Sequence, residues 1–209
     1  MSRPDPGTGF PPVVAIASRN PGKIREILAI CSDWPVEWTT AREGGDPWPE
    51  VEETGSTYLE NARLKARGVS DALGIAALAD DSGIEVDALG GAPGPRSARF
   101  AGEDATDEEN LRKLIELVRA TPASGRGARY RCVAVLARSE GSEAVAEGRC
   151  EGSLIDRPRG TGGFGYDPIF VPAGRSETMA ELDPQSKDRI SHRGRALRAL
   201  QAELARASD

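Results

Sequence analysis

The sequence lacks the features that mark secreted and membrane-spanning proteins. Its 209 residues include three cysteines, Cys31, Cys132 and Cys150, which show no CxxC spacing. An odd number of cysteines without a pattern indicates reduced thiols in a reducing compartment. No apolar run is long enough to cross a bilayer, and residues 1–12 lack the apolar core of a secretory signal. We therefore expect a cytoplasmic protein with no membrane partner.

An excess of positive charge is also missing. The chain has 27 lysines and arginines against 33 aspartates and glutamates, for a formal net charge of −6. Proteins that bind duplex DNA or RNA usually carry a basic excess, so we expect no nucleic-acid partner. The charge still permits a small anionic ligand in a local basic pocket. Aromatic residues make up only 5%, which predicts a core built mostly from Val, Ile, Leu and Ala.

Strand-like and helix-like segments alternate along the chain. The expected strands are residues 13–17, 36–38, 75–79, 129–137, 143–151, 152–156 and 169–171. Helix starts are marked by an N-cap pattern at Asn20-Pro21 and by capping boxes at Thr57/Glu60 and Thr106/Glu109, and a last helix is expected at 186–205. This order predicts an α/β fold with a mixed central sheet flanked by helices. We expect residues 1–12 to be a flexible leader and residues 13–209 to be a single domain.

Two adjacent acids follow a buried apolar segment. The run IAALA at residues 75–79 predicts a strand that ends as Asp80, Asp81 and Ser82 lead into Gly83. Adjacent carboxylates repel each other unless a metal ion, a basic cluster or water relieves the charge. The pattern predicts either a functional pair of acids or a polar strand end in which Ser82 caps a turn.

An acidic loop supplies further carboxylates at Glu50, Glu52 and Glu53. Carboxylate oxygens from two segments, together with waters and phosphate oxygens, are the usual ligands of Mg²⁺ in proteins. The loop therefore predicts part of a magnesium site if it meets Asp80 and Asp81 at one edge of the sheet. The alternative for the loop is a solvated acidic face.

Three further segments carry groups suited to an anion or a base. SRNPGK at 18–23 places Gly22 and Lys23 at a helix N-terminus, which suits a phosphate, although an ordinary N-cap with a solvated lysine fits too. GGFGYDP at 162–168 offers two aromatic rings that either stack on a base or pack in the core. SKDRISHRGRA at 186–196 is a dense basic cluster in an acidic protein and predicts a local anion site.

The motifs in this order resemble the inosine triphosphate pyrophosphatases, which hydrolyse aberrant purine nucleoside triphosphates. The resemblance runs from Val13 to about Leu204 and rests on SRNPGK, EETGSTYLENARLKA, ADDSGIEVDALGGAPGPRSARFAG, GTGGFGYDPIF and SHRGRAL. It implies an elongated, two-lobed α/β fold with the active site in the cleft between the lobes, and a homodimer. It also implies Mg²⁺-dependent hydrolysis of ITP, dITP and XTP to the monophosphate and pyrophosphate, which keeps deaminated purines out of DNA and RNA.

The resemblance also implies roles for individual residues. Asp81 is expected as the catalytic acid/base and a metal ligand, with Glu53 as the second metal-side carboxylate and Glu50 as the next choice. The expected substrate-binding residues are Ser18, Arg19, Asn20, Pro21, Gly22, Lys23, Ser82, Phe164, Gly165, Tyr166, Asp167, Lys187, His192 and Arg193.

The substituent at purine position 6 gives base selection a physical explanation. Hypoxanthine and xanthine carry a 6-oxo acceptor where adenine carries an amino donor, and His192 and Arg193 can donate to that oxygen. Adenine would leave buried donors unpaired, which can cost roughly 10⁴-fold in rate. Two alternatives remain: a pyrophosphatase for pyrimidine or other modified nucleotides, and a nucleotide-binding module without enzymatic activity.

Overall fold

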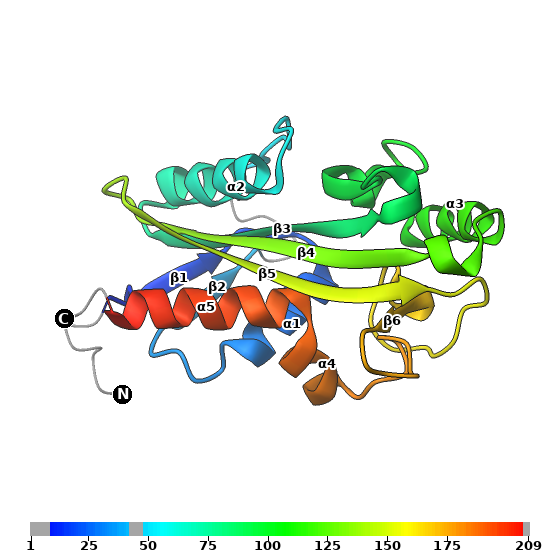
Figure 1. Ribbon diagram of the computed structural model, residues 1–209. Coiled ribbons are helices and arrows are strands. Elements are labelled where there is room, and N and C mark those ends of the chain that lie inside the picture. The colour runs from blue at the N-terminus through cyan, green and yellow to red at the C-terminus, as the bar shows by residue number, and fades with distance from the viewer. Residues whose placement is uncertain (1–8, 42–47, 207–209) are drawn as a thin grey trace. The chain divides into compact units, whose positions relative to one another are not determined.

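The computed structural model describes residues 9–41 and 48–206, and six strands in this part of the chain form one mixed sheet with the order β2-β1-β3-β4-β5-β6 (Figure 1). The strands are β1 (Val13–Ile16), β2 (Glu37–Thr40), β3 (Ala76–Val86), β4 (Gly127–Ala137), β5 (Glu143–Leu154) and β6 (Phe170–Pro172). The α-helices are α1 (Pro21–Ile30), α2 (Tyr58–Leu73), α3 (Asp107–Arg119), α4 (Pro184–Ile190) and α5 (His192–Arg206). β1 pairs in parallel with β2 and β3, whereas β5 and β6 are antiparallel. The predicted α/β fold with a mixed sheet is confirmed.

The chain divides into two compact units, each with its own core. The first unit comprises the described residues up to 81 together with 132–148 and 193–206; the second comprises 82–131 and 149–192. The expected active-site cleft between two lobes, and the single domain over 13–209, stay predictions. Within the described ranges, no helix has the length and apolar character needed to cross a membrane.

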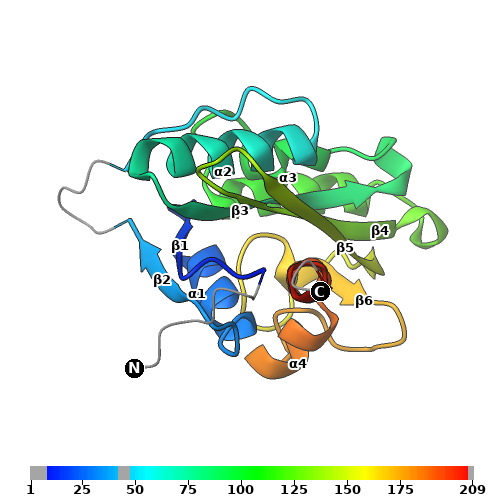
Figure 2. The same ribbon diagram turned by 90° about the vertical axis from the view of Figure 1, so that its left-hand side faces the viewer.

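Side-chain alternation along the strands gives the first unit two separate apolar layers. Val14 and Ile16 of β1 join one cluster with α1 and α5, whereas Ala15 of β1 and Ala17, the residue that follows this strand, join another with α2. Figure 2 shows α2 on one side of these strands and α1 and α5 on the other. Because successive residues of a strand point to opposite faces, odd and even positions of the neighbouring β3 must divide in the same way.

Local sequence signals place the helix starts correctly. Asn20 caps α1 with Pro21 in the first turn, and Thr57 and Thr106 form complete capping boxes at α2 and α3. The single last helix expected at 186–205 is wrong, because Ser191 is extended (ψ 155°) and separates α4 from α5. The two strands expected at 143–151 and 152–156 are instead one strand, β5.

Residues 9–12 of the expected leader are described, and residues 1–8 lie outside the described part of the chain. The ring of Phe10 packs edge-on against Trp34 with 5.3 Å between centroids. The carbonyl of Gly9 accepts a 2.6 Å hydrogen bond from Arg138. These contacts tie residues 9 and 10 to the first unit.

The strand expected to end before Gly83 continues to Val86, so Asp80 and Asp81 lie inside β3 rather than at its tip. Gly83 does not break the strand but permits a close approach. A Cβ atom there would lie 2.3 Å from the Gly94 carbonyl oxygen and 2.4 Å from Ser97 Oγ. The glycine is therefore a packing requirement imposed by a distant segment, which the local sequence cannot reveal.

We predict that Gly83→Ala lowers the free energy of unfolding by about 2 kcal/mol, because the added methyl group meets backbone that must move. Urea unfolding at neutral pH measures the change. Gly102→Ala is the matched control, since a Cβ at that glycine meets nothing within 4 Å. Equal stability of the two variants would contradict the packing argument.

Candidate functional site

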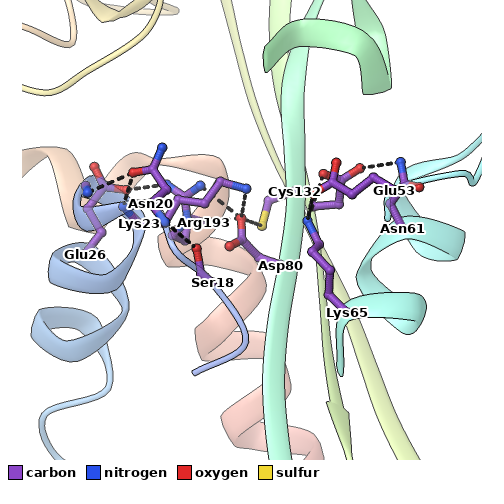
Figure 3. A network of polar contacts seen from close by, with 12 residues as sticks. Ser18, Asn20, Lys23, Glu26, Glu53, Asn61, Lys65, Asp80, Cys132 and Arg193 are labelled. Carbon is purple, nitrogen blue, oxygen red and sulfur yellow. Dashed lines mark hydrogen bonds and ion pairs between the residues drawn. The ribbon is translucent and has the colours of Figure 1, made fainter. Parts of the chain in front are cut away.

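Asp80 and Asp81 leave β3 on opposite faces of the sheet. In Figure 3, Asp80 lies on one side of β3 with Lys23 and Arg193, whereas Lys65 and Asn61 lie on the other side. Asp81 is bonded to Asn61 and Lys65, both from α2. Among the ion pairs of the described residues, the two carboxylates therefore do not contact the same cation, although their adjacency in sequence suggests a shared one. Each has its own partners, and the alternation of the strand relieves their repulsion.

Asp80 is the centre of a buried ion network. Arg193 donates to its Oδ2 from Nη2 (2.9 Å) and Nε (3.3 Å), and Arg193 Nη1 also donates to Glu26. Lys23 Nζ lies 3.3 Å from the same oxygen. Burial alone would raise the pKa of Asp80, but Arg193, Lys23 and Lys65 outweigh it and hold this pKa well below its usual range. Asp80 is thus ionised and links α1 and α5 to the sheet.

Asp81 has a different environment. Asn61 donates to its Oδ2 (3.2 Å), and Lys65 Nζ lies 3.4 Å from its Oδ1. Burial raises the pKa of Asp81 and Glu53 adds to the rise, while Lys65 and Lys23 oppose it. A carboxylate with a raised pKa is a better proton acceptor than an ordinary one. Of the two aspartates, Asp81 is the one suited to acid–base chemistry.

Glu53 is brought to the same site by Lys65. Lys65 Nζ lies 2.7 Å from Glu53 Oε1, so one ammonium group bridges Glu53 and Asp81. Burial would lower the pKa of Lys65, but Asp81, Glu53 and Asp80 together raise it, which keeps the bridge charged. Glu50, in contrast, has a side chain 86% exposed and lies 3.8 Å from Arg19. The structure thus favours Glu53 over Glu50 as the partner of Asp81.

The donor set at Asp81 and Glu53 fits Mg²⁺. The two carboxylates come from different segments, and both lie next to the ammonium group of Lys65. Mg²⁺ is commonly held by one or two carboxylates together with substrate phosphates. Across the described ranges, no group of three or more His, Cys, Asp or Glu side chains is arranged to hold a metal. The residues therefore suit a cation shared with phosphate rather than one enclosed by protein alone.

The SRNPGK segment leads into α1, which begins at Pro21 after the N-cap Asn20. Asn20 Oδ1 accepts from the N–H groups of Gly22 (2.8 Å) and Lys23 (3.1 Å), and Ser18 Oγ accepts from Asn20 N (3.2 Å). The N–H groups considered for phosphate binding are thus engaged within the chain, as in an ordinary N-cap. Lys23 is not solvated, however, because its ammonium group faces Asp80. Attraction of a phosphate at this end of α1 rests on Lys23.

In the second unit, Asp167 joins several expected substrate-binding residues. Its Oδ2 accepts from Lys187 Nζ (2.5 Å) and from Phe164 N (3.0 Å), and its Oδ1 accepts from the hydroxyl of Tyr130 (3.1 Å). Lys187 Nζ also lies 5.1 Å from the centre of the Phe164 ring. Gly163 has φ +70°, and a Cβ there would lie 2.1 Å from Asp167 Oδ2. The Gly-rich loop is therefore shaped around this carboxylate.

The remaining expected residues of the loop divide. Tyr166 is buried, and its hydroxyl donates to the Ser97 carbonyl (2.8 Å). Its ring belongs to the apolar cluster of the second unit, which is the alternative considered for this motif, and this burial raises the pKa of Tyr166. Gly165 adopts φ +59° beside Phe164, which is half-buried. Of the two aromatic rings in this loop, that of Phe164 is therefore the less buried.

Ser82 is half-buried in β3 and is the first residue of the second unit.

His192 and Arg193 are adjacent but serve different clusters. The imidazole of His192 stacks on Tyr130 with ring centroids 4.5 Å apart and planes 8° apart. Arg193 is directed to Asp80 and Glu26, and only 1% of it is exposed. The expectation that both donate to a purine oxygen stays a prediction; in the structure, Arg193 is engaged by the two carboxylates.

Sequence reasoning did not single out Asn61, Lys65 and Tyr130. Asn61 and Lys65 are four residues apart on α2 and so share a face, and both lie within a motif already quoted. That spacing could have identified them. Tyr130 had no such signal, because an aromatic residue in a strand is usually a core residue.

Nearly the whole chain is similar in sequence and in structure to known proteins of one family. The family model described as the Ham1 family matches residues 14–203. A protein from Shigella flexneri named dITP/XTP pyrophosphatase is 47% identical over 189 residues, which cover 90% of this chain and 95% of that protein. The structure of a HAM1 protein from Coxiella burnetii superimposes with a TM-score of 0.82 at 41% identity, covering 93% of this chain and 98% of that one. A Mycobacterium abscessus structure described as nucleoside-triphosphatase / dITP/XTP pyrophosphatase gives a TM-score of 0.71 at 44% identity, covering 90% and 98%.

We predict that Asp80→Asn lowers the free energy of unfolding by about 3–5 kcal/mol, because it leaves buried cationic partners without their counter-charge. Asp71→Asn removes an exposed aspartate from α2 and should change stability by no more than about 0.5 kcal/mol. Urea titration of the two variants at pH 7 compares them. A small effect at both positions would show that the network around Asp80 does not depend on its charge.

Proposed function

The chain belongs to the Ham1 family, and we propose that it hydrolyses aberrant purine nucleoside triphosphates, dITP, ITP and XTP, to the monophosphate and pyrophosphate. The observation that carries the proposal is the environment of Asp81, a buried carboxylate with a raised pKa beside Glu53 and Lys65. The names of the relatives and the motif resemblance support the same substrates. The activity would remove deaminated purines from the nucleotide pool.

Asp81 would act on the attacking water. Cleavage next to the α-phosphate needs a water in line with the pyrophosphate leaving group, and the protein mainly supplies positioning and charge. Asp81 would accept the proton of that water as a general base. Asn61 donates to one carboxylate oxygen and Lys65 lies near the other, so both hold the carboxylate in a fixed orientation.

Asp81 and Glu53 would hold Mg²⁺, which is part of the proposal rather than of the structure. The ion would supply positive charge to the phosphate oxygens and so make the pyrophosphate a better leaving group. Lys23 would offset further charge on the triphosphate, and its ammonium group is kept in place by Asp80. The resemblance assigns Lys187 and Phe164 to substrate binding as well.

Base selection would depend on His192. A donor from its imidazole pairs with the 6-oxo group of hypoxanthine or xanthine, whereas the 6-amino group of adenine offers no acceptor at that place. A site built around such a bond can reject the wrong base by roughly 10⁴-fold. Arg193 would contribute indirectly, because among the cationic side chains around Asp80 it does most to keep that carboxylate ionised.

We also propose that the protein is a homodimer of the cytoplasm with no nucleic-acid partner. The resemblance supports the dimer, and the three buried cysteines, which form no disulfide among the described residues, fit a reducing compartment. The net charge of −6 supports the absence of a nucleic-acid partner.

We predict that the purified protein releases pyrophosphate from dITP, ITP and XTP in the presence of Mg²⁺. ATP should be turned over far more slowly, with a gap in kcat/KM that approaches roughly 10⁴-fold. GTP should also be turned over slowly, but because guanine shares the 6-oxo group, its exclusion would have to act on its 2-amino group. Chelation with EDTA should stop the reaction, and added Mg²⁺ should restore it. Equal turnover of ATP would remove the base-selection argument, and a preference for pyrimidine nucleotides would place the enzyme in a different substrate class.

We predict that Asp81→Asn lowers kcat by about 10³-fold, because the amide cannot accept a proton from water. Binding of a non-hydrolysable dITP analogue, measured by calorimetry, should survive the substitution. Asp71→Asn, on the exposed side of the same helix that supplies Asn61 and Lys65, should leave both kcat and KM unchanged. Full activity of Asp81→Asn would assign the chemistry to another residue.

A further inference from the structure

We propose that Tyr130 is a positioning residue for substrate recognition, which orients His192 through its ring and Asp167 through its hydroxyl. The inference rests on the proposed function, because it takes His192 and Lys187 as substrate-binding residues. Neither the motif resemblance nor the reaction described above uses Tyr130. It lies in β4, and only 6% of it is exposed.

The hydroxyl of Tyr130 sets the direction of a carboxylate. It donates to Asp167 Oδ1 at 3.1 Å, while Oδ2 of the same group accepts from Lys187 (2.5 Å) and from Phe164 N (3.0 Å). A carboxylate can rotate about its bond to Cβ, so a bond to one oxygen fixes where the other one points. Tyr130 therefore helps to keep Oδ2 directed at the ammonium group of Lys187 and at the backbone that carries the Phe164 ring.

The ring of Tyr130 sets the plane of the imidazole. It lies nearly parallel to the ring of His192, with centroids 4.5 Å apart and 8° between planes. It also packs against Phe170, which is completely buried, at 4.7 Å and 55°. The nitrogens of an imidazole donate and accept in the plane of the ring. By fixing that plane, Tyr130 restricts the directions in which His192 can hydrogen-bond.

The hydroxyl is more than core packing needs. Ala128, Cys150 and Met179 share the apolar cluster that contains Tyr130, and a phenylalanine would fill the same space. A buried hydroxyl is costly unless it is hydrogen-bonded. Here its partner is a carboxylate, for which hydrogen bonds are stronger than between neutral groups. Tyr130 thus contacts both His192, which is proposed to recognise the base, and Asp167, which holds Lys187.

Two substitutions separate the two roles. Tyr130→Phe keeps the ring and removes the hydroxyl, so we expect KM for dITP to rise about tenfold, with kcat within about twofold of wild type and unchanged preference for dITP over dATP. Tyr130→Leu removes both. We expect it to raise KM at least as much and to lower the dITP/dATP ratio of kcat/KM by about tenfold.

Leu114→Ala is the control for a merely structural effect. Leu114 belongs to the same apolar cluster but comes from α3 and is completely buried. The substitution should lower the melting temperature, while KM for dITP and the dITP/dATP ratio at 25 °C stay at wild-type values. If Leu114→Ala and Tyr130→Phe change KM alike, Tyr130 acts only through stability and the inference is overturned.

A spectroscopic test reads the stack without any turnover. His192 is the only histidine of the chain, so untagged protein labelled in its histidine rings gives one set of imidazole NMR signals. The stacked ring of Tyr130 should shift these signals upfield. Tyr130→Phe and Leu114→Ala should keep the shift, and Tyr130→Leu should abolish it. Retention of the shift in Tyr130→Leu would overturn the inference.

The two levels of the argument fail differently. A wild-type protein that releases no pyrophosphate from dITP overturns the proposed function. An active wild-type protein whose Tyr130→Phe and Tyr130→Leu variants keep the normal KM and base preference overturns the inference alone. Tyr130→Phe keeps the shape of the core, so this comparison remains decisive if Tyr130→Leu does not fold.

Discussion

The alternation of side chains along β3 is the constraint on which the candidate site depends. It sends Asp80 toward α1 and α5 and Asp81 toward α2, although the two residues are adjacent in sequence. On one face, Arg193 and Lys23 lower the pKa of Asp80 against the effect of burial; on the other, burial prevails and the pKa of Asp81 is raised. Neighbouring acids whose environments push their pKa values apart are suited to different tasks.

The network around Asp80 is better understood as a positioning device than as a source of stability. Burying charges costs free energy that their attraction repays only partly, so a buried ion pair is weak support for stability. What the network does achieve is geometric: Arg193 ties the beginning of α5 to β3, and Lys23 brings the first turn of α1 to the same carboxylate. The acid–base role that we propose belongs to Asp81, on the opposite face.

The sequence predicts those features whose causes are local. The N-cap of α1 and the capping boxes of α2 and α3 could be predicted because each involves residues within one helical turn. Features that depend on distant segments could not. Gly83 resembles a strand breaker in the sequence, but a glycine is needed there because the Gly94 carbonyl approaches it closely. Similarly, the apolar spacing of residues 186–205 does not reveal that residue 191 is extended and separates two helices.

The candidate site shows the same division. The motifs identified Asp81, Lys23, Asp167, Lys187 and His192 as chemically important residue types, but their partners follow from the fold. The residue pattern of the ADDSG motif does not say which of the two aspartates lies in surroundings that suit a proton acceptor. The contacts of α2 with one face of β3 decide this. Likewise, only the structure separates His192 from Arg193, since Tyr130 and Asp80 come from different strands.

The charges at Asp81 also bear on the metal. Asp81 and Glu53 contribute two carboxylates and Lys65 one ammonium group, which leaves this cluster with one unit of negative charge when all three are ionised. Such a cluster repels a triphosphate at short range, because the interaction of like charges is strong where water is excluded. A divalent cation reverses the sign, whereas a second lysine would only cancel it. The balance of these three side chains therefore supports the proposal that a divalent cation would accompany the triphosphate.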